Sequence, residues 1–204
     1  MIVPRPSRWN EVVEAAAVAF RDRGYHATRL EDIAEKLGMR KGSLYNYIDS
    51  KEGLLLAVVT PPATQLLDAL SALSDSELPA SEKIRLVARS HGRVVEEYLP
   101  YVAVYVQEIA GQDHSPEWRE RDRAYVRQLS AIIEEGRQSG LFDPATVPVI
   151  SSMALIGALN WMTRWYVPGG ELSAEEIADR IASGFLAGML ARGSAAPSAA
   201  RDQG

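Results

Sequence analysis

Cysteine is absent from the 204-residue chain. Disulfide frameworks, thiolate zinc sites and cysteine nucleophiles are therefore excluded, and the composition fits a reducing compartment. The three histidines, His26, His91 and His114, lie far apart and lack the spacing of metal ligands. Neither a glycine-rich phosphate loop nor a nucleophile elbow occurs. We expect no catalytic residues, no metal site and no cofactor, and hence a protein that is not an enzyme.

A long uninterrupted apolar run is also lacking. The longest apolar stretch, 147–162, contains one proline, two serines and an asparagine. It falls short of the roughly 20 apolar residues that span a bilayer. The N-terminal MIVPRPSRW has too short an apolar run for a signal peptide and is interrupted by prolines. We therefore expect no membrane partner and a cytoplasmic location.

Strand signals are nearly missing as well. No segment shows sustained alternation of apolar and polar residues, and no Asn-Gly or Asp-Gly turn occurs. Apolar residues instead recur at helical spacing, and glycines and prolines separate the periodic segments. These patterns predict an all-α fold of about nine helices. The approximate ranges are 7–23, 28–37, 41–47, 51–73, 80–98, 100–110, 116–139, 149–166 and 174–192.

Three local signals refine the predicted helix boundaries. Thr28 with Glu31, and Ser173 with Glu176, have the spacing of capping boxes, in which a hydroxyl and a carboxylate satisfy the first free N–H groups of a helix. The pair 61–62 is Pro-Pro, which removes two consecutive N–H groups and predicts a kink or a restart in the helix around it.

The segment 28–54, TRLEDIAEKLGMRKGSLYNYIDSKEGL, has the pattern of a helix-turn-helix. With Leu30 as position one, Ala34 falls where a larger side chain would push the two helices apart. Gly38 falls where the turn needs a positive φ. The positions that must be apolar or large to hold the helices are filled by Ile33, Leu37, Met39, Leu44 and Tyr47.

Polar and basic residues gather at the second helix of this motif, whose N-terminal end enters the DNA major groove. Lys41 can donate to a guanine edge, Asn46 can pair with an adenine edge, and Gly42 permits close backbone approach. Residues 1–60 hold 9 basic and 8 acidic residues, whereas residues 61–204 hold 13 and 19. The predicted DNA contacts are Thr28, Arg40, Lys41, Gly42, Ser43, Tyr45, Asn46, Tyr47 and Lys51.

Residues 8–55 resemble the DNA-binding domain of the tetracycline-repressor (TetR) family. The family pattern there reads Gly-Ser/Thr-Leu-Tyr, any residue, His-Phe, any residue, Ser-Lys-Glu, any residue, Leu. KGSLYNYIDSKEGL at 41–54 departs from it at Tyr47 and Ile48, which keep an aromatic and an apolar anchor. The resemblance implies a homodimer that binds a palindromic DNA operator and a repression relieved by a small-molecule effector. It also implies a helix-turn-helix domain at 1–55, a ligand-binding and dimerisation domain at 56–192, and a disordered tail at 193–204.

Aromatic and polar groups concentrate in the second domain, as expected of an apolar pocket with a few polar handles. Single aromatic residues at helical spacing are as often core residues as ligand contacts, and Arg164 can pair with Glu108 instead of an anionic ligand group. The predicted ligand contacts are Tyr101, Tyr105, Glu108, Trp118, Tyr125, Asn160, Trp161 and Arg164.

Three further segments resemble the TetR branch that controls sterol and fatty-acid degradation: YVQEIA at 105–110, IEEGRQSGLF at 133–142 and RWYVPGG at 164–170. This resemblance implies an acyl-CoA thioester as effector, whose phosphates meet basic side chains of 116–139. The candidates are Arg119, Arg121, Arg123 and Arg127, for which the alternative is a solvated helix face. The alternative is a TetR-type repressor of an efflux gene that responds to a lipophilic, drug-like compound. The small residues of the last two predicted helices, such as Gly157, Gly184 and Gly188, favour a dimer interface there.

Overall fold

The computed structural model describes residues 6–110 and 116–190, and within these ranges it is all-α with nine α-helices. The predicted disordered tail, 193–204, lies outside the described residues. The helices are α1 (Pro6–Arg23), α2 (Leu30–Lys36), α3 (Lys41–Leu44), α4 (Lys51–Ser74), α5 (Ala80–Glu97), α6 (Leu99–Glu108), α7 (Pro116–Gln138), α8 (Pro148–Trp161) and α9 (Ala174–Met189). A short 3₁₀ turn, η1 (Met162–Arg164), follows α8.

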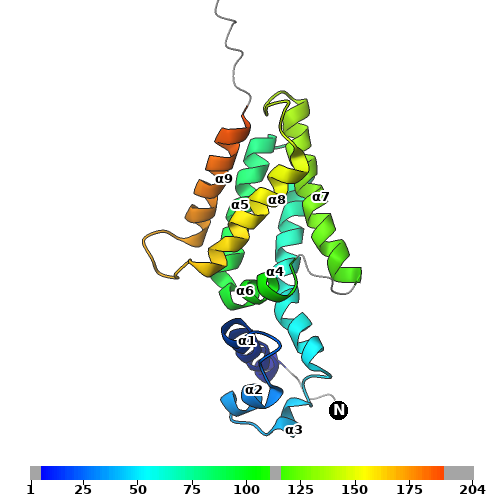
Figure 1. Ribbon diagram of the computed structural model, residues 1–204, viewed down its shortest axis with the longest axis vertical. Helices are drawn as coiled ribbons and strands as arrows, with labels where there is room; N and C mark the ends of the chain where they lie inside the picture. The colour runs from blue at the N-terminus through cyan, green and yellow to red at the C-terminus, as the bar shows by residue number, and fades with distance from the viewer. Residues whose placement is uncertain (1–5, 111–115, 191–204) are drawn as a thin grey trace, which may run out of the picture.

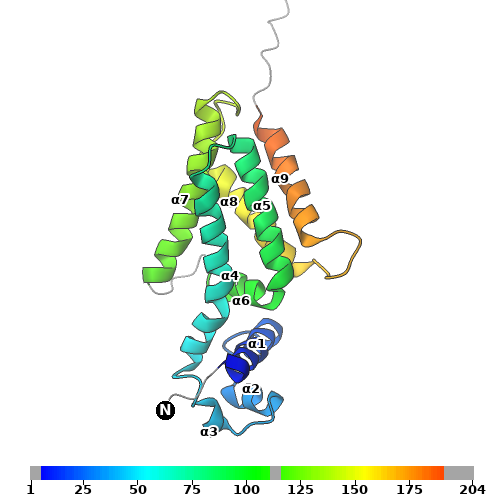
Figure 2. The ribbon, with the colours of Figure 1, turned by 180° about the vertical axis from the view of Figure 1, so that it is seen from behind.

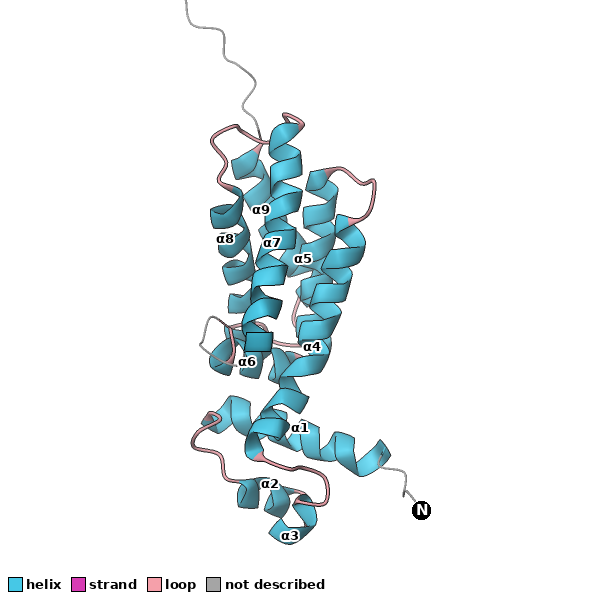
Figure 3. Ribbon diagram, turned by 90° about the vertical axis from the view of Figure 1, so that its right-hand side faces the viewer, coloured by secondary structure: helices cyan, strands magenta, loops and turns pink. Residues whose placement is uncertain are grey.

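The molecule is elongated, with α1, α2 and α3 at one end and an upright bundle of α5, α7, α8 and α9 at the other (Figure 1). Helix α4 runs from the small end into the bundle, and α6 lies across the lower end of the bundle, above α1, as the reverse view also shows (Figure 2). The side view separates the same two parts and shows α4 as the long connection between them (Figure 3).

Two hydrophobic clusters stabilise the fold, and α4 contributes to both. Leu54 and Val58 from its first half pack with α1, α2 and α3, whereas Leu66 and Leu70 from its second half belong to the bundle core. The first cluster also includes Trp118 of α7. Apolar burial drives this packing, so the small end is joined to the bundle by shared core and not only by a chain connection.

Helix α4 excludes the restart, one of the two outcomes predicted for the Pro-Pro pair. Pro61 and Pro62 lie inside one helix without a restart. Each proline removes an N–H and leaves the carbonyl four residues earlier without its helical donor. The Thr60 hydroxyl donates to the Leu56 carbonyl at 2.6 Å within the same turn. Buried neighbours on either side, Val59 and Leu66 among them, hold the helix in place through the proline pair.

The length and composition of α4 would also allow it to cross a membrane, the one such helix in the described ranges. The same test is passed by core helices of soluble proteins. Seven of its residues are buried in the fold, among them Leu54 and Leu70. We therefore interpret α4 as the core helix that joins the two parts.

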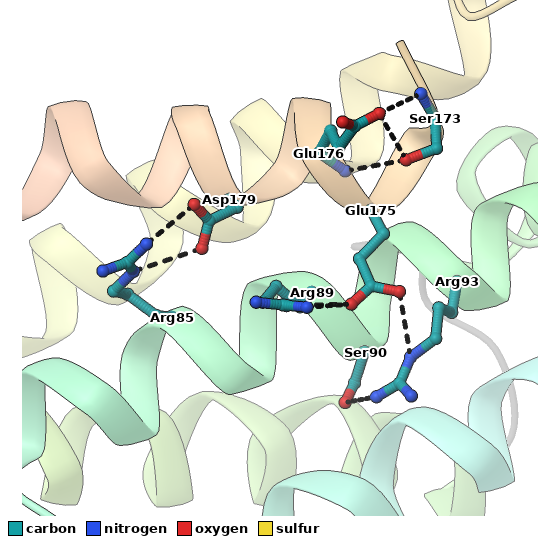
Figure 4. Close-up of polar contacts among 8 residues, drawn as sticks. All are labelled: Arg85, Arg89, Ser90, Arg93, Ser173, Glu175, Glu176 and Asp179. Carbon is teal, nitrogen blue, oxygen red and sulfur yellow. Dashed lines mark hydrogen bonds and ion pairs between the residues drawn. The ribbon is translucent and has the colours of Figure 1, made fainter.

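The predicted capping box at Ser173 is confirmed. The Ser173 hydroxyl accepts the Glu176 N–H at 3.2 Å, and the Glu176 carboxylate accepts the Ser173 N–H at 2.9 Å. Helix α9 then packs closely along α5, because Gly92 of α5 has no side chain: a Cβ there would lie 2.4 Å from the Ala174 carbonyl oxygen. Arginines of α5 pair with carboxylates of α9 beside this contact, namely Arg85 with Asp179 and Arg89 and Arg93 with Glu175 (Figure 4).

Candidate DNA-binding face and ligand cavity

The helix-turn-helix is built as the sequence pattern predicts. Ile33, Ala34 and Leu44 are buried between the two helices, and Gly38 adopts φ 62° in the turn. Helix α3 is shorter than predicted, since regular α-helix ends at Leu44 and turns continue through Tyr47. Ile48 is buried and anchors the segment after α3, which leaves the polar side of α3 free to face outward.

Six of the nine predicted DNA contacts lie exposed on one short segment: Arg40, Lys41, Gly42, Ser43, Tyr45 and Asn46. Tyr47 is half-buried. Lys41 pairs with Glu31 of α2, and the Lys41 hydrogen bond holds the pKa of the Glu31 carboxyl below its ordinary value. The same bond raises the pKa of Lys41. Both side chains are about half exposed, so this pair is weak and a DNA phosphate or base edge can replace Glu31.

Thr28 requires a correction. Helix α2 begins at Leu30, with Arg29 as the residue before it, and the Asp32 carboxylate accepts the Arg29 N–H at 3.3 Å. Thr28 is 1% exposed, and its hydroxyl donates to the carbonyl oxygens of Gly24 at 2.8 Å and Ala19 at 3.1 Å. Its side chain therefore ties the turn to α1. It neither caps α2 nor faces the surface where DNA would lie.

Lys51 lies in a network at the start of α4 and is half-buried. Its ammonium donates to the His26 carbonyl at 3.3 Å and lies 4.5 Å from the centre of the Tyr25 ring. Ser50 caps this helix, because its hydroxyl accepts the Gly53 N–H at 2.9 Å. Lys51 thus fixes the loop between α1 and α2 against α4, in addition to any contact with DNA.

A cavity of about 590 Å³ opens between helices α4, α5, α6, α7 and α8. Pockets of this size hold drug-sized ligands. Its wall is mostly apolar and includes Leu66 and Leu67 of α4, Val126 of α7 and Met153 and Ile156 of α8. Four of the eight predicted ligand contacts line it: Tyr105, Trp118, Tyr125 and Asn160.

The other four predicted ligand contacts lie elsewhere. Tyr101 packs in the cluster beneath the bundle and contacts the Tyr98 ring edge-on, with ring centres 5.7 Å apart. The Glu108 carboxylate accepts the backbone N–H of Tyr25 at 3.1 Å. Trp161 and Arg164 are exposed beyond the cavity wall. Among the described residues Arg164 has no ion pair, so neither the predicted pairing with Glu108 nor a place in the wall is observed for it.

Charged and polar groups from α7 line one side of the cavity. Arg121 donates to the Thr64 hydroxyl at 3.1 Å and lies 5.3 Å from the Trp118 ring centre. Arg123 and Arg127 are exposed. Asp122 accepts a short hydrogen bond from the Tyr105 hydroxyl, and burial together with this bond raises the pKa of Tyr105.

His91 of α5 is among the wall residues that the sequence reasoning missed. It is 2% exposed, and burial lowers its pKa to about 4. The sequence does carry a signal for it: Ile84, Val87, Ala88, His91 and Val95 recur at helical spacing on the buried face of α5. A histidine on an apolar stripe is expected to point into the core.

An apolar surface remains on α8 and α9. Ile150, Met153 and Trp161 of α8 are each more than 60% exposed. On α9, the exposed residues Gly184, Ala187 and Gly188 are small, and a Cβ on either glycine would meet nothing within 4 Å. Large exposed apolar side chains beside a surface of small residues mark a protein interaction site.

Comparison with known proteins identifies both halves of the chain. Residues 12–58 match the family described as "Bacterial regulatory proteins, tetR family", and residues 77–189 match "Tetracyclin repressor-like, C-terminal domain". The HTH-type transcriptional repressor KstR2 of Mycolicibacterium smegmatis is 29% identical over 187 residues, 90% of this chain and 91% of the relative.

Two solved structures share the fold. The ketosteroid transcriptional regulator KstR2 of Mycobacterium tuberculosis superposes with a TM-score of 0.84 at 24% identity, over 93% of this chain and 98% of that chain. AibR in complex with isovaleryl coenzyme A and operator DNA superposes with a TM-score of 0.74 at 26% identity, over 90% of this chain and 98% of that chain. The present chain belongs to the TetR family of bacterial transcriptional regulators, and it is a regulator and not an enzyme.

Proposed function

We propose that the protein is a ligand-responsive transcriptional repressor that binds a palindromic operator as a homodimer and is released by an acyl-CoA thioester. It acts in the cytoplasm, where both DNA and CoA thioesters are found. The observation that carries the effector class is the cavity, which combines a mostly apolar wall with three arginines of α7, Arg121, Arg123 and Arg127. An acyl group suits the apolar wall, and arginines bind phosphate groups strongly.

DNA binding is supported by the exposed segment 40–46 on and around α3. In a helix-turn-helix the N-terminal end of the second helix contacts base edges, and in α3 this end carries Lys41 and Ser43. Tyr45 and Asn46 are exposed in the turn that directly follows α3. The proposed contacts are the exposed residues of this segment together with Tyr47 and Lys51. The Lys51 ammonium would donate to a DNA phosphate in addition to the His26 carbonyl. Thr28 is left out because its hydroxyl is directed into the protein.

The homodimer is proposed to form through α8 and α9. The exposed Ile150 and Trp161 supply apolar area, and the small Gly184 and Gly188 permit close approach of a partner helix. A twofold dimer presents two copies of α3, which suits an operator with two half-sites. A likeness to AibR, solved with isovaleryl coenzyme A and operator DNA, supports both the effector class and the DNA partner.

Release of DNA is proposed to be a population shift. An effector lowers operator affinity only by as much as it prefers a conformation that DNA does not. Helix α6 is placed to link the two states, since Tyr105 lines the cavity and Glu108, near the end of the same helix, binds the Tyr25 N–H next to α1. Lys51 over the Tyr25 ring extends this link to the start of α4.

The test is fluorescence anisotropy of the protein on the DNA upstream of its own gene, with fatty and steroid-derived acyl-CoAs. Each thioester is compared with its free acid and with free CoA. Release by a thioester and not by its parts supports the proposal. Operator binding that resists every thioester but yields to a neutral lipophilic compound would instead establish the alternative, a repressor of an efflux gene.

A variant pair sharpens the test of the effector class. Arg123→Gln should raise the thioester concentration needed for half-release by about tenfold, the effect of losing one charged hydrogen bond. Arg164→Gln is the matched control, because Arg164 is exposed like Arg123 but lies outside the cavity wall. If both substitutions raised this concentration equally, or if neither changed it, the α7 arginines would not be the groups that bind the CoA phosphates.

A further inference from the structure

One side of the cavity is also part of the core of the small end, which carries α1, α2 and α3. Three wall residues, Ala63 of α4, Tyr105 of α6 and Trp118 of α7, pack in or against the hydrophobic cluster that holds these helices together. Other apolar wall residues, such as Leu66 and Ile156, belong to the bundle cluster instead. We call Ala63, Tyr105 and Trp118 the cavity floor, since the same three side chains border both the cavity and the small-end core.

Trp118 is the largest side chain of the cavity floor and is packed on several sides. It is 5% exposed, its ring centre lies 6.2 Å from that of Tyr105, and the guanidinium of Arg121 lies 5.3 Å from it. Densely packed side chains move together, because a protein interior has little free volume to absorb a displacement. A displacement of the Trp118 ring therefore also shifts the small-end residues that pack on it.

Two hydrogen bonds connect the start of α7 to its neighbouring helices, one turn after Trp118. The Tyr105 hydroxyl donates a short bond to Asp122, which joins α6 to α7. Arg121 donates to the Thr64 hydroxyl at 3.1 Å, which joins α7 to α4. Helices α4 and α6 both pack on α1. A movement of the first turns of α7 is therefore passed to the two helices that contact the small end.

Helix α4 can bend at the level of the cavity floor. Ala63 directly follows Pro61 and Pro62, which donate no backbone hydrogen bonds, so two helical bonds are missing there. Leu54, before the prolines, packs in the small-end core, and Leu66, after them, packs in the bundle core. A rotation of the small end against the bundle thus breaks fewer bonds of α4 at this point than at an intact helical turn.

An effector changes operator affinity only through groups that are placed differently in the two conformations of the protein. We propose that Trp118 is the side chain through which the acyl group acts. The acyl group packs against the Trp118 ring and favours a conformation in which the cavity floor and the small end are shifted relative to the bundle. This inference rests on the proposed acyl-CoA effector and names the side chain that links its cavity to operator binding.

The test measures effector binding and operator release separately in Trp118→Leu. Leucine keeps an apolar floor but leaves space beneath the effector, so the effector no longer has to displace the floor. The probe is the fatty or steroid-derived acyl-CoA that releases the wild-type protein at the lowest concentration. We expect its binding without DNA to stay within about threefold of the wild type, while the concentration for half-release rises about tenfold, a typical coupling between two sites.

Tyr125→Leu is the matched control. Tyr125 lies two turns after Trp118 on the same helix and lines the same cavity, but it packs against the bundle core. Its substitution should change the binding constant and the release concentration by the same factor. Isothermal titration and operator anisotropy on the same samples give the two quantities. Operator affinity without effector, and the helical circular dichroism spectrum, verify that each variant is folded.

Trp118→Phe is a second variant in case the leucine variant does not fold. Phenylalanine keeps an aromatic ring but is smaller, so it leaves part of the space and should raise the release concentration about threefold with unchanged thioester binding. Release by the wild-type concentration in every folded Trp118 variant would overturn the inference.

The remaining outcomes separate the inference from the proposed function. Equal changes in binding and release in Trp118→Leu mean that Trp118 only forms part of the wall, which overturns the inference and leaves the effector class standing. No release of the wild type by any thioester overturns the effector class and, with it, the inference. A raised release concentration without a matching loss of binding, seen in Trp118→Leu and not in Tyr125→Leu, supports both.

Discussion

Single residues decide how this protein binds DNA, and Lys41 is one of the exposed basic residues proposed to contact it. Its ammonium pairs with Glu31 and can exchange that carboxylate for a phosphate. We predict that Lys41→Ala weakens operator binding and lowers by about one the slope of log affinity against log salt, as expected for one lost phosphate contact. Affinity measured from 50 to 200 mM salt tests this.

Arg180→Ala is the matched control for Lys41. Arg180 is an exposed cation on α9, at the other end of the molecule from α3. It removes the same charge, so a change in long-range attraction alone would affect both variants similarly. An identical salt slope for wild type and Lys41→Ala would mean that Lys41 stays with Glu31 in the complex.

His91 also predicts a pH dependence of stability. Its pKa is about 4 in the fold against 6.5 in an unfolded chain, so the unfolded state binds a proton that the folded state refuses. The contribution of neutral His91 to the free energy of unfolding is thus fully present above pH 6.5, and it is lost as the pH falls to about 4. By linkage the loss is about 3 kcal/mol. His91→Leu should remove this part of the acid sensitivity in urea unfolding at pH 7 and pH 4.5.

The exposed His26 provides the control, since His26→Leu removes an imidazole outside the core. We expect the wild type and His26→Leu to lose similar stability in acid, and His91→Leu to lose less. Carboxylates held by ion pairs add a separate loss at lower pH: the Arg137 and Gln138 hydrogen bonds lower the pKa of Glu134 to about 2. A wild-type loss equal to that of His91→Leu would contradict a neutral His91 in the fold.

Predictions for single residues were right where one motif sets several requirements at the same position. Leu44, Ala34 and Gly38 each satisfy spacing, size and backbone demands of the same motif, and the structure confirms their burial or φ. Thr28 was misassigned as the cap of α2 because Thr28 and Glu31 have the spacing of a capping box. In the structure the residue before α2 is Arg29, one position later. The Thr28 hydroxyl found nearer acceptors in Gly24 and Ala19, contacts that only the folded turn creates.

Among the helices, α6 is the element placed to carry a signal from the cavity to the DNA-binding end. Tyr105 lies in the cavity wall, and one turn later Glu108 binds the Tyr25 N–H. We predict that Glu108→Ala leaves thioester binding within about twofold of the wild type but raises several-fold the concentration needed to release DNA. Isothermal titration and operator anisotropy on the same samples separate the two effects.

A control for Glu108 comes from the same chain. Glu97→Ala removes an exposed carboxylate at the end of α5 and should change neither quantity. Equal increases in the binding constant and in the release concentration for Glu108→Ala would mean that Glu108 acts on the cavity itself. That result would leave α6 without a role in coupling.

Helix boundaries followed from the sequence at Pro116 and Ser173, where a proline and a capping box mark the start of a helix. They failed where tertiary packing overrides a local signal. Pro61 and Pro62 predict a kink or a restart, and the restart does not occur, because burial of the flanking α4 residues in two cores stabilises one helix. Helix α3 ends early, since after Leu44 the chain must turn to bury Ile48.

At the scale of the whole molecule, the cavity was only half predictable. Aromatic composition identified Tyr105, Trp118 and Tyr125, because they lie on faces that turn toward α4 and α5. The same composition could not distinguish Trp161 from the residues that line the cavity. Trp161 lies on the same helix as Asn160 but points to the outer surface. Which side of α8 faces the cavity depends on how α8 packs against α7, and periodicity is uninformative for a helix that is apolar on all sides.

Because α8 is apolar on its outer surface as well as on the surface packed in the bundle, we expect a second subunit to cover the outer surface in the functional protein. We predict that Ile150→Asp together with Trp161→Asp gives a folded monomer with at least about a hundredfold weaker operator binding, since one half-site alone is then held at a time. Leu78→Asp, an exposed apolar residue in the loop before α5, is the control and should stay dimeric. Sedimentation velocity reports the oligomeric state, and a double variant that remains a dimer would move the interface away from α8.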